Sequence, residues 1–272
     1  METLQAPINT AFSGNIPQHY DAGLGPLFFE PFALELADRI SELAPDRVLE
    51  LACGTGRLTR RLADRLQPSA RIVATDVNPA MLQFAQQVIP DPRVLWNVVD
   101  AVDLPYVDSS FDIVVAQFGV MFYSDRIKAY REALRVLKPG GKLIFTCWDR
   151  LESNPVAAAT QRVVKRFFPE GTPAFYTVPF AYHDRALIRE EVLTAGFMRA
   201  DLRLAELIGC ASTADAAATG LLEGSPIHTA IIDRDPFALP AMKQMLSADL
   251  AAEFGYNDLN VPLSAWVVEA VK

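Results

Sequence analysis

The sequence has few of the residues that cross-link small folds or bind metal ions. Only three cysteines are present, Cys53, Cys147 and Cys210, together with three histidines, in a chain of 272 residues. The cysteines lie far apart and show no paired spacing, which argues against a disulfide framework and favours a reducing compartment. No His/Cys/carboxylate cluster has the spacing of metal ligands, so we expect no bound metal.

Long apolar runs and basic stretches are also missing. The longest uncharged stretches, such as 113–124, fall well short of the roughly 20 residues that a membrane-spanning helix needs. The first residues lack the basic cluster and apolar run of a signal peptide. With 25 Lys+Arg against 33 Asp+Glu, the net charge is −8, and no basic stripe is present to bind phosphates. We therefore expect a soluble, cytoplasmic protein with no membrane insertion and no nucleic-acid partner.

Strand-like and helical patterns alternate through the first half of the chain. Buried strands are predicted at 47–52, 71–76, 93–100, 111–118 and 142–148. Helices of ordinary length separate them, so the strands must pair in parallel through right-handed crossovers. The pattern predicts a doubly wound, Rossmann-like α/β sheet.

The second half carries weaker signals. Ser212 to Asp215 reads as a capping box that opens a helix. A final strand is expected from Leu263 to Ala270, and Pro262 beside it indicates a strand end or a sheet edge.

Ligands of open α/β sheets bind beyond the carboxyl ends of the strands. In this sequence a glycine loop, Glu50 to Gly56, follows the first strand, and the second strand ends in Asp76, 22 residues past Gly54. That is the spacing of a carboxylate that binds ribose hydroxyls. The third strand ends in Asp100, which could accept a hydrogen bond from an adenine amine. A glycine loop alone remains compatible with nucleotides, dinucleotides or tight packing.

The ordered set of motifs resembles the class I S-adenosylmethionine-dependent methyltransferases. The similarity is to the branch that includes the ubiquinone/menaquinone C-methyltransferases and many small-molecule enzymes, and it covers roughly residues 45–148. It rests on VLELACGTGRLT, IVATDVNPAML, VVDAVDLPYVDSSFDIVVAQFGVMF and LRVLKPGGKLIF. The resemblance implies a seven-stranded sheet whose last strand is antiparallel, and S-adenosylmethionine as cofactor, with S-adenosylhomocysteine as product.

The resemblance also assigns roles around the first two strand ends. Glu50 would organise the glycine loop and the amino group of the ligand. Ala52, Cys53 and Gly54 would supply backbone around the methionine moiety, and Asp76 would bind the ribose diol. One departure is that Ala52 stands where the commonest form of the motif has glycine.

The adenine is assigned to residues after the second and third strands. Val77 and Met81 would lie on its two faces. Asp100, with the backbone amides of Ala101 and Val102, would bind its edge.

Two further parts of the chain are expected to complete the cofactor site. Gln117 would contact the methionine amino group through its carbonyl, with Phe118 beside it. Tyr20, in an N-terminal His-Tyr-Asp stretch, would close over the cofactor carboxylate. The aromatic residues of the N-terminal segment and of 171–183 predict a lid over an apolar substrate.

These assignments divide one methyltransferase domain, 1–272, into four parts. Residues 1–44 form an N-terminal lid and helix, and 45–148 the cofactor-binding core. Residues 149–196 form a substrate cap, and 197–272 add C-terminal strands and helices.

The expected function is methyl transfer to a small, apolar or aromatic molecule. The general base is unknown; the candidates are His19, Tyr123 and His183. A non-catalytic S-adenosylmethionine-binding module and an NAD(P)-dependent oxidoreductase are the alternatives. The acceptor atom and the oligomeric state are not readable from the sequence, and a homodimer is compatible with it.

Overall fold

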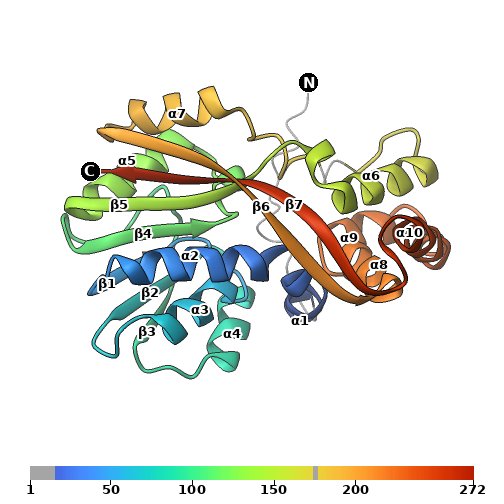
Figure 1. The fold of residues 1–272 in the computed structure, drawn as a ribbon, viewed down its shortest axis with the longest axis horizontal. Helices are drawn as coiled ribbons and strands as arrows, with labels where there is room; N and C mark the ends of the chain where they lie inside the picture. The colour runs from blue at the N-terminus through green and yellow to red at the C-terminus, as the bar shows by residue number, and fades with distance from the viewer. Residues whose placement is uncertain (1–15, 174–176) are drawn as a thin grey trace. The chain divides into compact units, whose positions relative to one another are not determined.

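A computed structural model describes residues 16–173 and 177–272 of the protein, and its strands form one mixed sheet (Figure 1). The strands are β1 (Arg47–Glu50), β2 (Arg71–Asp76), β3 (Val94–Val98), β4 (Phe111–Gln117), β5 (Leu137–Trp148), β6 (Arg199–Thr213) and β7 (Asn257–Val271). The helices are α1 (Ile16–His19), η2 (Tyr20–Phe29), α2 (Glu30–Glu42), α3 (Arg57–Arg65), α4 (Pro79–Val88), η3 (Val120–Phe122), α5 (Arg126–Val136), η4 (Leu151–Ser153), α6 (Pro155–Phe167), α7 (Arg185–Thr194), α8 (Ala214–Glu223), α9 (Ile227–Ile232) and α10 (Ala238–Phe254).

The order of the strands confirms the predicted fold class. The seven strands lie in the order β3-β2-β1-β4-β5-β7-β6. The pairs β1–β2, β1–β4, β2–β3 and β4–β5 are parallel, and β7 runs antiparallel to β5. Strands β2 and β3 follow β1 on one side of it, whereas β4 and β5 lie on its other side, so the strand order reverses between β1 and β4. Doubly wound sheets bind ligands at such a switch point.

Burial on both faces explains why the middle of each central strand is apolar. Val48 and Leu49 of β1, and Val114 and Val115 of β4, are fully buried. Helices α3 and α4 contact β2, and α5 contacts β5. Parallel strands covered in this way are continuous apolar runs rather than alternating ones.

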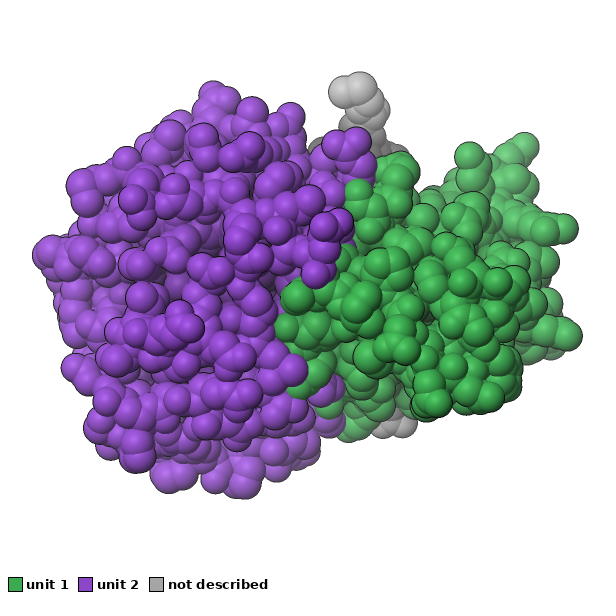
Figure 2. All heavy atoms as spheres, in the orientation of Figure 1, with its two compact units in different colours: residues 1–31, 151–178, 207–263 green, residues 32–150, 179–206, 264–272 purple. Residues whose placement is uncertain are grey.

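The chain divides into two compact units, each assembled from three segments (Figure 2). Unit 1 comprises 1–31, 151–178 and 207–263, and unit 2 comprises 32–150, 179–206 and 264–272. Unit 2 holds the parallel strands, whereas β6 and β7 contribute residues to both units. The four-part division of a single domain stays a prediction.

An aromatic cluster fills unit 2 beside the end of β4. Phe118 stacks on Trp148 with ring centroids 3.8 Å apart, and Phe32 meets both rings edge-on. Phe180 contacts Trp148 from the other segment of the unit, with centroids 5.7 Å apart. All four side chains are buried, so this stack is a rigid apolar wall next to the switch point.

A polar network fixes the segment that carries Phe180. The Arg126 guanidinium pairs with both carboxylate oxygens of Glu191, at 2.7 and 2.8 Å, and lies over the Tyr182 ring. The Tyr182 hydroxyl donates to Glu191 at 2.7 Å and lies 3.2 Å from that of Tyr130. Tyr182 and Phe180 are therefore packed into the core of unit 2, and the lid over an apolar substrate stays a prediction; Phe12, Phe175 and Tyr176, expected in the same lid, lie outside the described residues.

Helices of unit 1 pack through glycine. Helix α8 contacts both η2 and α10, and α10 contacts α6. A Cβ on Gly220 of α8 would lie 2.8 Å from the Cα of Gly23 in η2, and a Cβ on Gly23 would lie 2.5 Å from the Cα of Gly220. The two backbones approach more closely than any side chain allows.

Two expectations for the C-terminal half are wrong in detail. The N-cap of α8 is Thr213, whose hydroxyl accepts from Ala216 N at 3.1 Å, and not Ser212, because the strand continues one residue further. Pro262 lies inside the 15-residue β7 rather than at its end. Pairing of β7 with β5 covers Ala265 to Val271, so a missing N–H at 262 removes no hydrogen bond with β5.

None of the helices formed by residues 16–173 and 177–272 is long and apolar enough to cross a membrane.

The glycine contact predicts a strong packing defect from a small change. Gly220→Ala should lower the free energy of unfolding by about 1–3 kcal/mol, because the added methyl group overlaps η2. Thr219→Ala, a truncation at the neighbouring, partly exposed position, is the control and should leave stability within about 0.5 kcal/mol. Urea unfolding followed by circular dichroism measures both. Equal midpoints for the two variants would contradict the close packing.

Candidate functional site

The site begins at the loop that follows β1. Ala52, Gly54 and Gly56 all have left-handed backbone, with φ of 52°, 56° and 79°. Gly56 is also confined, since a Cβ there would lie 2.6 Å from Ile89 Cδ1. At Gly54, by contrast, a Cβ would meet no atom within 4 Å apart from its chain neighbours. The backbone at Gly54 is therefore open to close approach by a ligand.

Glu50 lies at the end of β1 with its side chain buried. Thr59 Oγ1 donates to Glu50 Oε2 at 2.6 Å, and Thr75 Oγ1 donates to the Glu50 carbonyl at 2.9 Å. Burial raises the pKa of Glu50 to about 8; the Thr59 hydrogen bond opposes the rise and the nearby Asp76 carboxylate adds to it. The Glu50 carboxyl is thus largely protonated at neutral pH unless a cation binds beside it.

Asp76 ties three elements together at the end of β2. Its Oδ2 accepts from Gly54 N and its Oδ1 from Asn78 N, both at 2.8 Å. Asn78 Oδ1 in turn caps α4, accepting from Ala80 N and Met81 N. Burial raises the pKa of Asp76, and the amide hydrogen bonds oppose that rise. Each carboxylate oxygen retains a second lone pair that can accept from a ligand hydroxyl.

The two carboxyl groups lie at neighbouring strand ends, and no basic side chain pairs with either among the described residues. Buried carboxylates are costly without a cationic partner. The same part of the chain shows no group of three or more His, Cys, Asp or Glu side chains able to hold a metal ion.

The residues assigned to the adenine lie on the next strand ends. Val77 is 40% exposed, whereas Met81 and Ala101 are buried. Asp100 is exposed, and its Oδ1 accepts from Val102 N at 3.1 Å. An adenine edge bound by the Val102 amide would have to replace that internal hydrogen bond.

The end of β4 carries a second left-handed residue. Phe118 has a φ of 53°, and its amide donates to the carbonyl and hydroxyl oxygens of Thr146 on β5. Gly119 follows, where a Cβ would lie 2.5 Å from Ala52 Cβ. The loops after β1 and β4 thus meet without space for a side chain, and non-glycine residues in this backbone region concentrate at functional sites.

The three candidates for a general base have different surroundings. His19 is exposed in unit 1, and Tyr20 next to it stacks on Phe29. His183 is partly buried in unit 2, and its Nδ1–H donates to the Phe180 carbonyl at 2.8 Å. The hydroxyl of Tyr123 is buried, and burial raises its pKa, with Asp76 and Asp100 contributing. A phenol held neutral in this way is a poor base; Tyr20 and His19 stay predictions.

Sequence reasoning missed the residues that hold the site together. Thr59 is hydrogen-bonded to Glu50, Asn78 to Asp76, and Thr146 to the amide of Phe118. Asn78-Pro79 carries a helix N-cap signal that could have been recognised. Thr59 and Thr146 give no such signal, because their partners are set by helix and strand packing.

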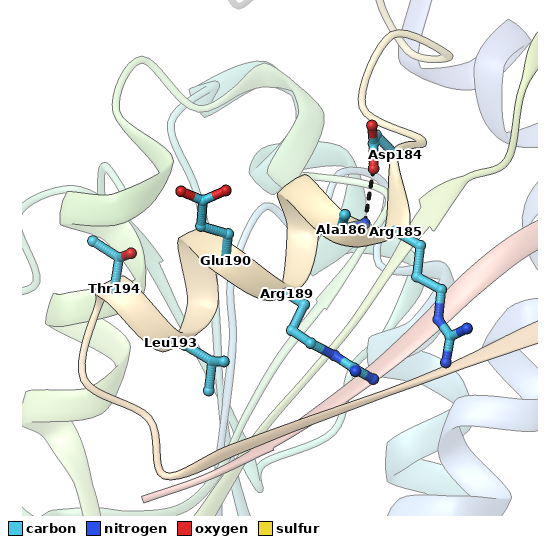
Figure 3. A pocket seen from close by; sticks show the side chains of 7 residues that line it. All are labelled: Asp184, Arg185, Ala186, Arg189, Glu190, Leu193 and Thr194. Atoms are coloured by element: carbon cyan, nitrogen blue, oxygen red, sulfur yellow. Dashed lines mark hydrogen bonds between the residues drawn. The ribbon is translucent and has the colours of Figure 1, made fainter.

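A separate groove of about 900 Å³ follows α7 (Figure 3). Arg185, Arg189 and Leu193 point to one side of this helix, and Glu190 and Thr194 to the other. All of the residues that line it come from α7 and its N-cap Asp184. None of the strand-end residues described above contributes to it.

Comparison with known proteins agrees with this geometry. Residues 49–145 match the family described as "Methyltransferase domain". A curated relative, the ubiquinone/menaquinone biosynthesis C-methyltransferase UbiE of Idiomarina loihiensis, is 36% identical over 121 residues, which are 43% of this chain and 47% of that protein. The chain thus spans about half the length of the curated relatives it matches. Residues 49–145 are thus similar to a methyltransferase domain, and the similarity to UbiE is confined to about half of each chain.

Solved structures share the fold at low sequence identity. Phosphoethanolamine N-methyltransferase 2 of Haemonchus contortus, in complex with phosphomonomethylethanolamine and S-adenosylhomocysteine, aligns with a TM-score of 0.58 and 19% identity, over 94% of this chain and 56% of that one. The [4+2]-cyclase SpnF aligns with a TM-score of 0.56 and 20% identity, over 95% and 92% of the two chains. These likenesses establish the fold.

Glu50 should make stability depend on pH. Its pKa of about 8 in the folded state exceeds the ordinary glutamate value, so its stabilising contribution is present in acid and is lost as pH rises through 8. The slope from this group should reach about 1.4 kcal/mol per pH unit between pH 5 and 8.

Glu50→Gln should flatten that slope, and Glu206→Gln, at an exposed position, should not. Urea titrations of the ligand-free proteins from pH 5 to 9 provide the comparison. Parallel curves for wild type and Glu50→Gln would show that the carboxyl is not held protonated.

Proposed function

We propose that the protein binds S-adenosylmethionine at the ends of β1, β2, β3 and β4 and transfers its methyl group to a small apolar or aromatic molecule. The observation that supports this most is the pair of buried carboxyl groups, Glu50 and Asp76, beside the open backbone of Gly54. S-adenosylmethionine carries a sulfonium and an ammonium, and carboxyl groups attract both of these positive charges.

In this proposal, each of these residues contacts a different part of the cofactor. Glu50 receives the ammonium, and Gly54 with its neighbours Ala52 and Cys53 lies along the methionine chain. Asp76 accepts from the ribose hydroxyls through its remaining lone pairs. The adenine lies between Val77 and Met81. Asp100, Ala101, Gln117 and Phe118 complete the enclosure.

When bound, S-adenosylmethionine supplies a methyl group on a positively charged sulfur that a nucleophile accepts by in-line displacement. The chain's contribution is alignment and exclusion of water, which can lower a barrier by about 7–11 kcal/mol when the partners are held in position. The buried rings of Phe118 and Trp148 provide a rigid neutral wall at the end of β4. A ring face near a sulfonium is favourable by about 0.5–2 kcal/mol.

An apolar acceptor is supported by the neighbouring side chains. The end of β4 is backed by the buried aromatic cluster of Phe32, Phe118, Trp148 and Phe180 in unit 2, which makes that side of the proposed site apolar. A relative named for ubiquinone and menaquinone biosynthesis also favours a ring-containing acceptor. If the acceptor atom carries a proton, His183 or water accepts that proton as the bond to the methyl carbon forms and the bond from that carbon to sulfur breaks.

A second candidate is a protein that binds the same cofactor without transferring its methyl group. The structural likeness to a [4+2]-cyclase supports it, because the fold does not fix the reaction. A dinucleotide oxidoreductase is disfavoured, because such a site needs a small residue where the helix packs on the strand, and Thr59, which is hydrogen-bonded to Glu50, stands there instead.

Charge at Asp76 should control cofactor affinity. Asp76→Asn should weaken S-adenosylmethionine binding about 10- to 100-fold, as expected for hydrogen bonds to a charged group. Asp103→Asn, an exposed neighbour, is the matched control and should bind as wild type. Titration calorimetry measures both, with NAD as a ligand that should not bind. Unchanged affinity in Asp76→Asn would remove this residue from the site.

Cofactor binding should release a proton. Because Glu50 has a pKa of about 8, an ammonium bound beside it should ionise the carboxyl near pH 7. The binding heat of S-adenosylmethionine should then differ between phosphate and Tris buffers. 5′-Methylthioadenosine lacks the ammonium and should give nearly the same heat in both. Buffer-independent heats for S-adenosylmethionine would contradict this role of Glu50.

Transfer itself is tested by S-adenosylhomocysteine release on a panel of quinone precursors, phenols and other small metabolites. Product formation with any of them, detected by mass spectrometry as a gain of one methyl group, supports the first candidate. Cofactor binding without product across the panel favours the second.

A further inference from the structure

The Tyr123 hydroxyl is a polar group that the fold buries and leaves without a partner. Its oxygen is inaccessible to solvent and makes no hydrogen bond among the described residues. Such a group costs about 1–3 kcal/mol when it remains unsatisfied. Because native structures rarely keep one without a reason, Tyr123 calls for a ligand or another explanation.

The local backbone places this hydroxyl firmly. Tyr123 ends the turn η3, donating its amide to the Val120 carbonyl at 3.3 Å, and Asp125 two residues later caps α5 by accepting from Lys128 N at 2.9 Å. The backbone on both sides of Tyr123 is therefore held by short-range hydrogen bonds.

The hydroxyl lies at the junction of the two left-handed loops. A Cβ on Gly119 would lie 3.7 Å from the Tyr123 oxygen and 2.5 Å from Ala52 Cβ. The carboxylates of Asp76 and Asp100 both act on it, and with burial they raise its pKa, so the group stays a neutral O–H donor. Asp76 and Asp100 are the residues assigned to the ribose and the adenine.

We propose that Tyr123 donates a hydrogen bond to the adenosyl part of bound S-adenosylmethionine and so positions the cofactor, in place of serving as a general base. The proposal rests on the proposed function and names a further binding residue of the same site. No methyl or proton transfer passes through the hydroxyl.

The test compares two tyrosine-to-phenylalanine variants, each of which removes one hydroxyl. Tyr123→Phe should weaken binding of S-adenosylhomocysteine and of 5′-methylthioadenosine by the same factor, roughly tenfold. Its ligand-free melting temperature should equal or exceed that of the wild type, because no internal hydrogen bond is lost. Tyr106→Phe should behave in the opposite way: its hydroxyl accepts from Asn97 Nδ2 at 3.0 Å, so stability should fall while both affinities stay unchanged.

Three results would overturn the inference. Unchanged affinity of Tyr123→Phe for both ligands would show that the hydroxyl does not reach the cofactor. A loss confined to S-adenosylhomocysteine would place the hydroxyl on the methionine end. A lower melting temperature of the ligand-free variant would show a partner within the protein. Failure of the wild type to bind either ligand would instead remove the proposed function, and this inference with it.

Discussion

The Asp76 carboxylate is the interaction on which the site depends. By accepting from the amides of Gly54 and Asn78, it fixes the glycine loop after β1 to the first turn of α4. Those two loops come from neighbouring parallel strands, so one side chain sets the spacing across that side of the switch point. A buried carboxylate bound only by backbone amides is preorganised and keeps its charge available to a ligand. In the proposed site the same group would therefore serve both stability and binding.

The sheet was readable from the sequence because its strands are buried on both faces. Predicted strands at 71–76 and 111–118 match β2 and β4 to within one residue. Beyond residue 150 the prediction was less complete: the expected strand from Leu263 to Ala270 covers only part of β7, which has 15 residues, from Asn257 to Val271. The π-helical segment η2 carries no sequence signal of its own; its close packing on α8 depends on Gly23 meeting a glycine about 200 positions away.

The candidate site was predictable where motif and strand end coincide. Glu50, Gly54, Asp76 and Asp100 follow successive strands, and parallel pairing places those ends on one edge. The protonation of Glu50 was not predictable, because it arises from burial and from the proximity of Asp76. Thr59 and Thr146 likewise act through partners nine and 28 residues away, at distances that only the packed fold sets.

The alternation of segments between the two units has a consequence for any fragment of this protein. The ranges 1–31, 32–150, 151–178, 179–206, 207–263 and 264–272 belong to the units by turns, so neither unit corresponds to a continuous stretch that could be expressed alone. The last nine residues complete the part of β7 that pairs with β5. A chain truncated before residue 264 would therefore lack the residues of β7 that pair with β5.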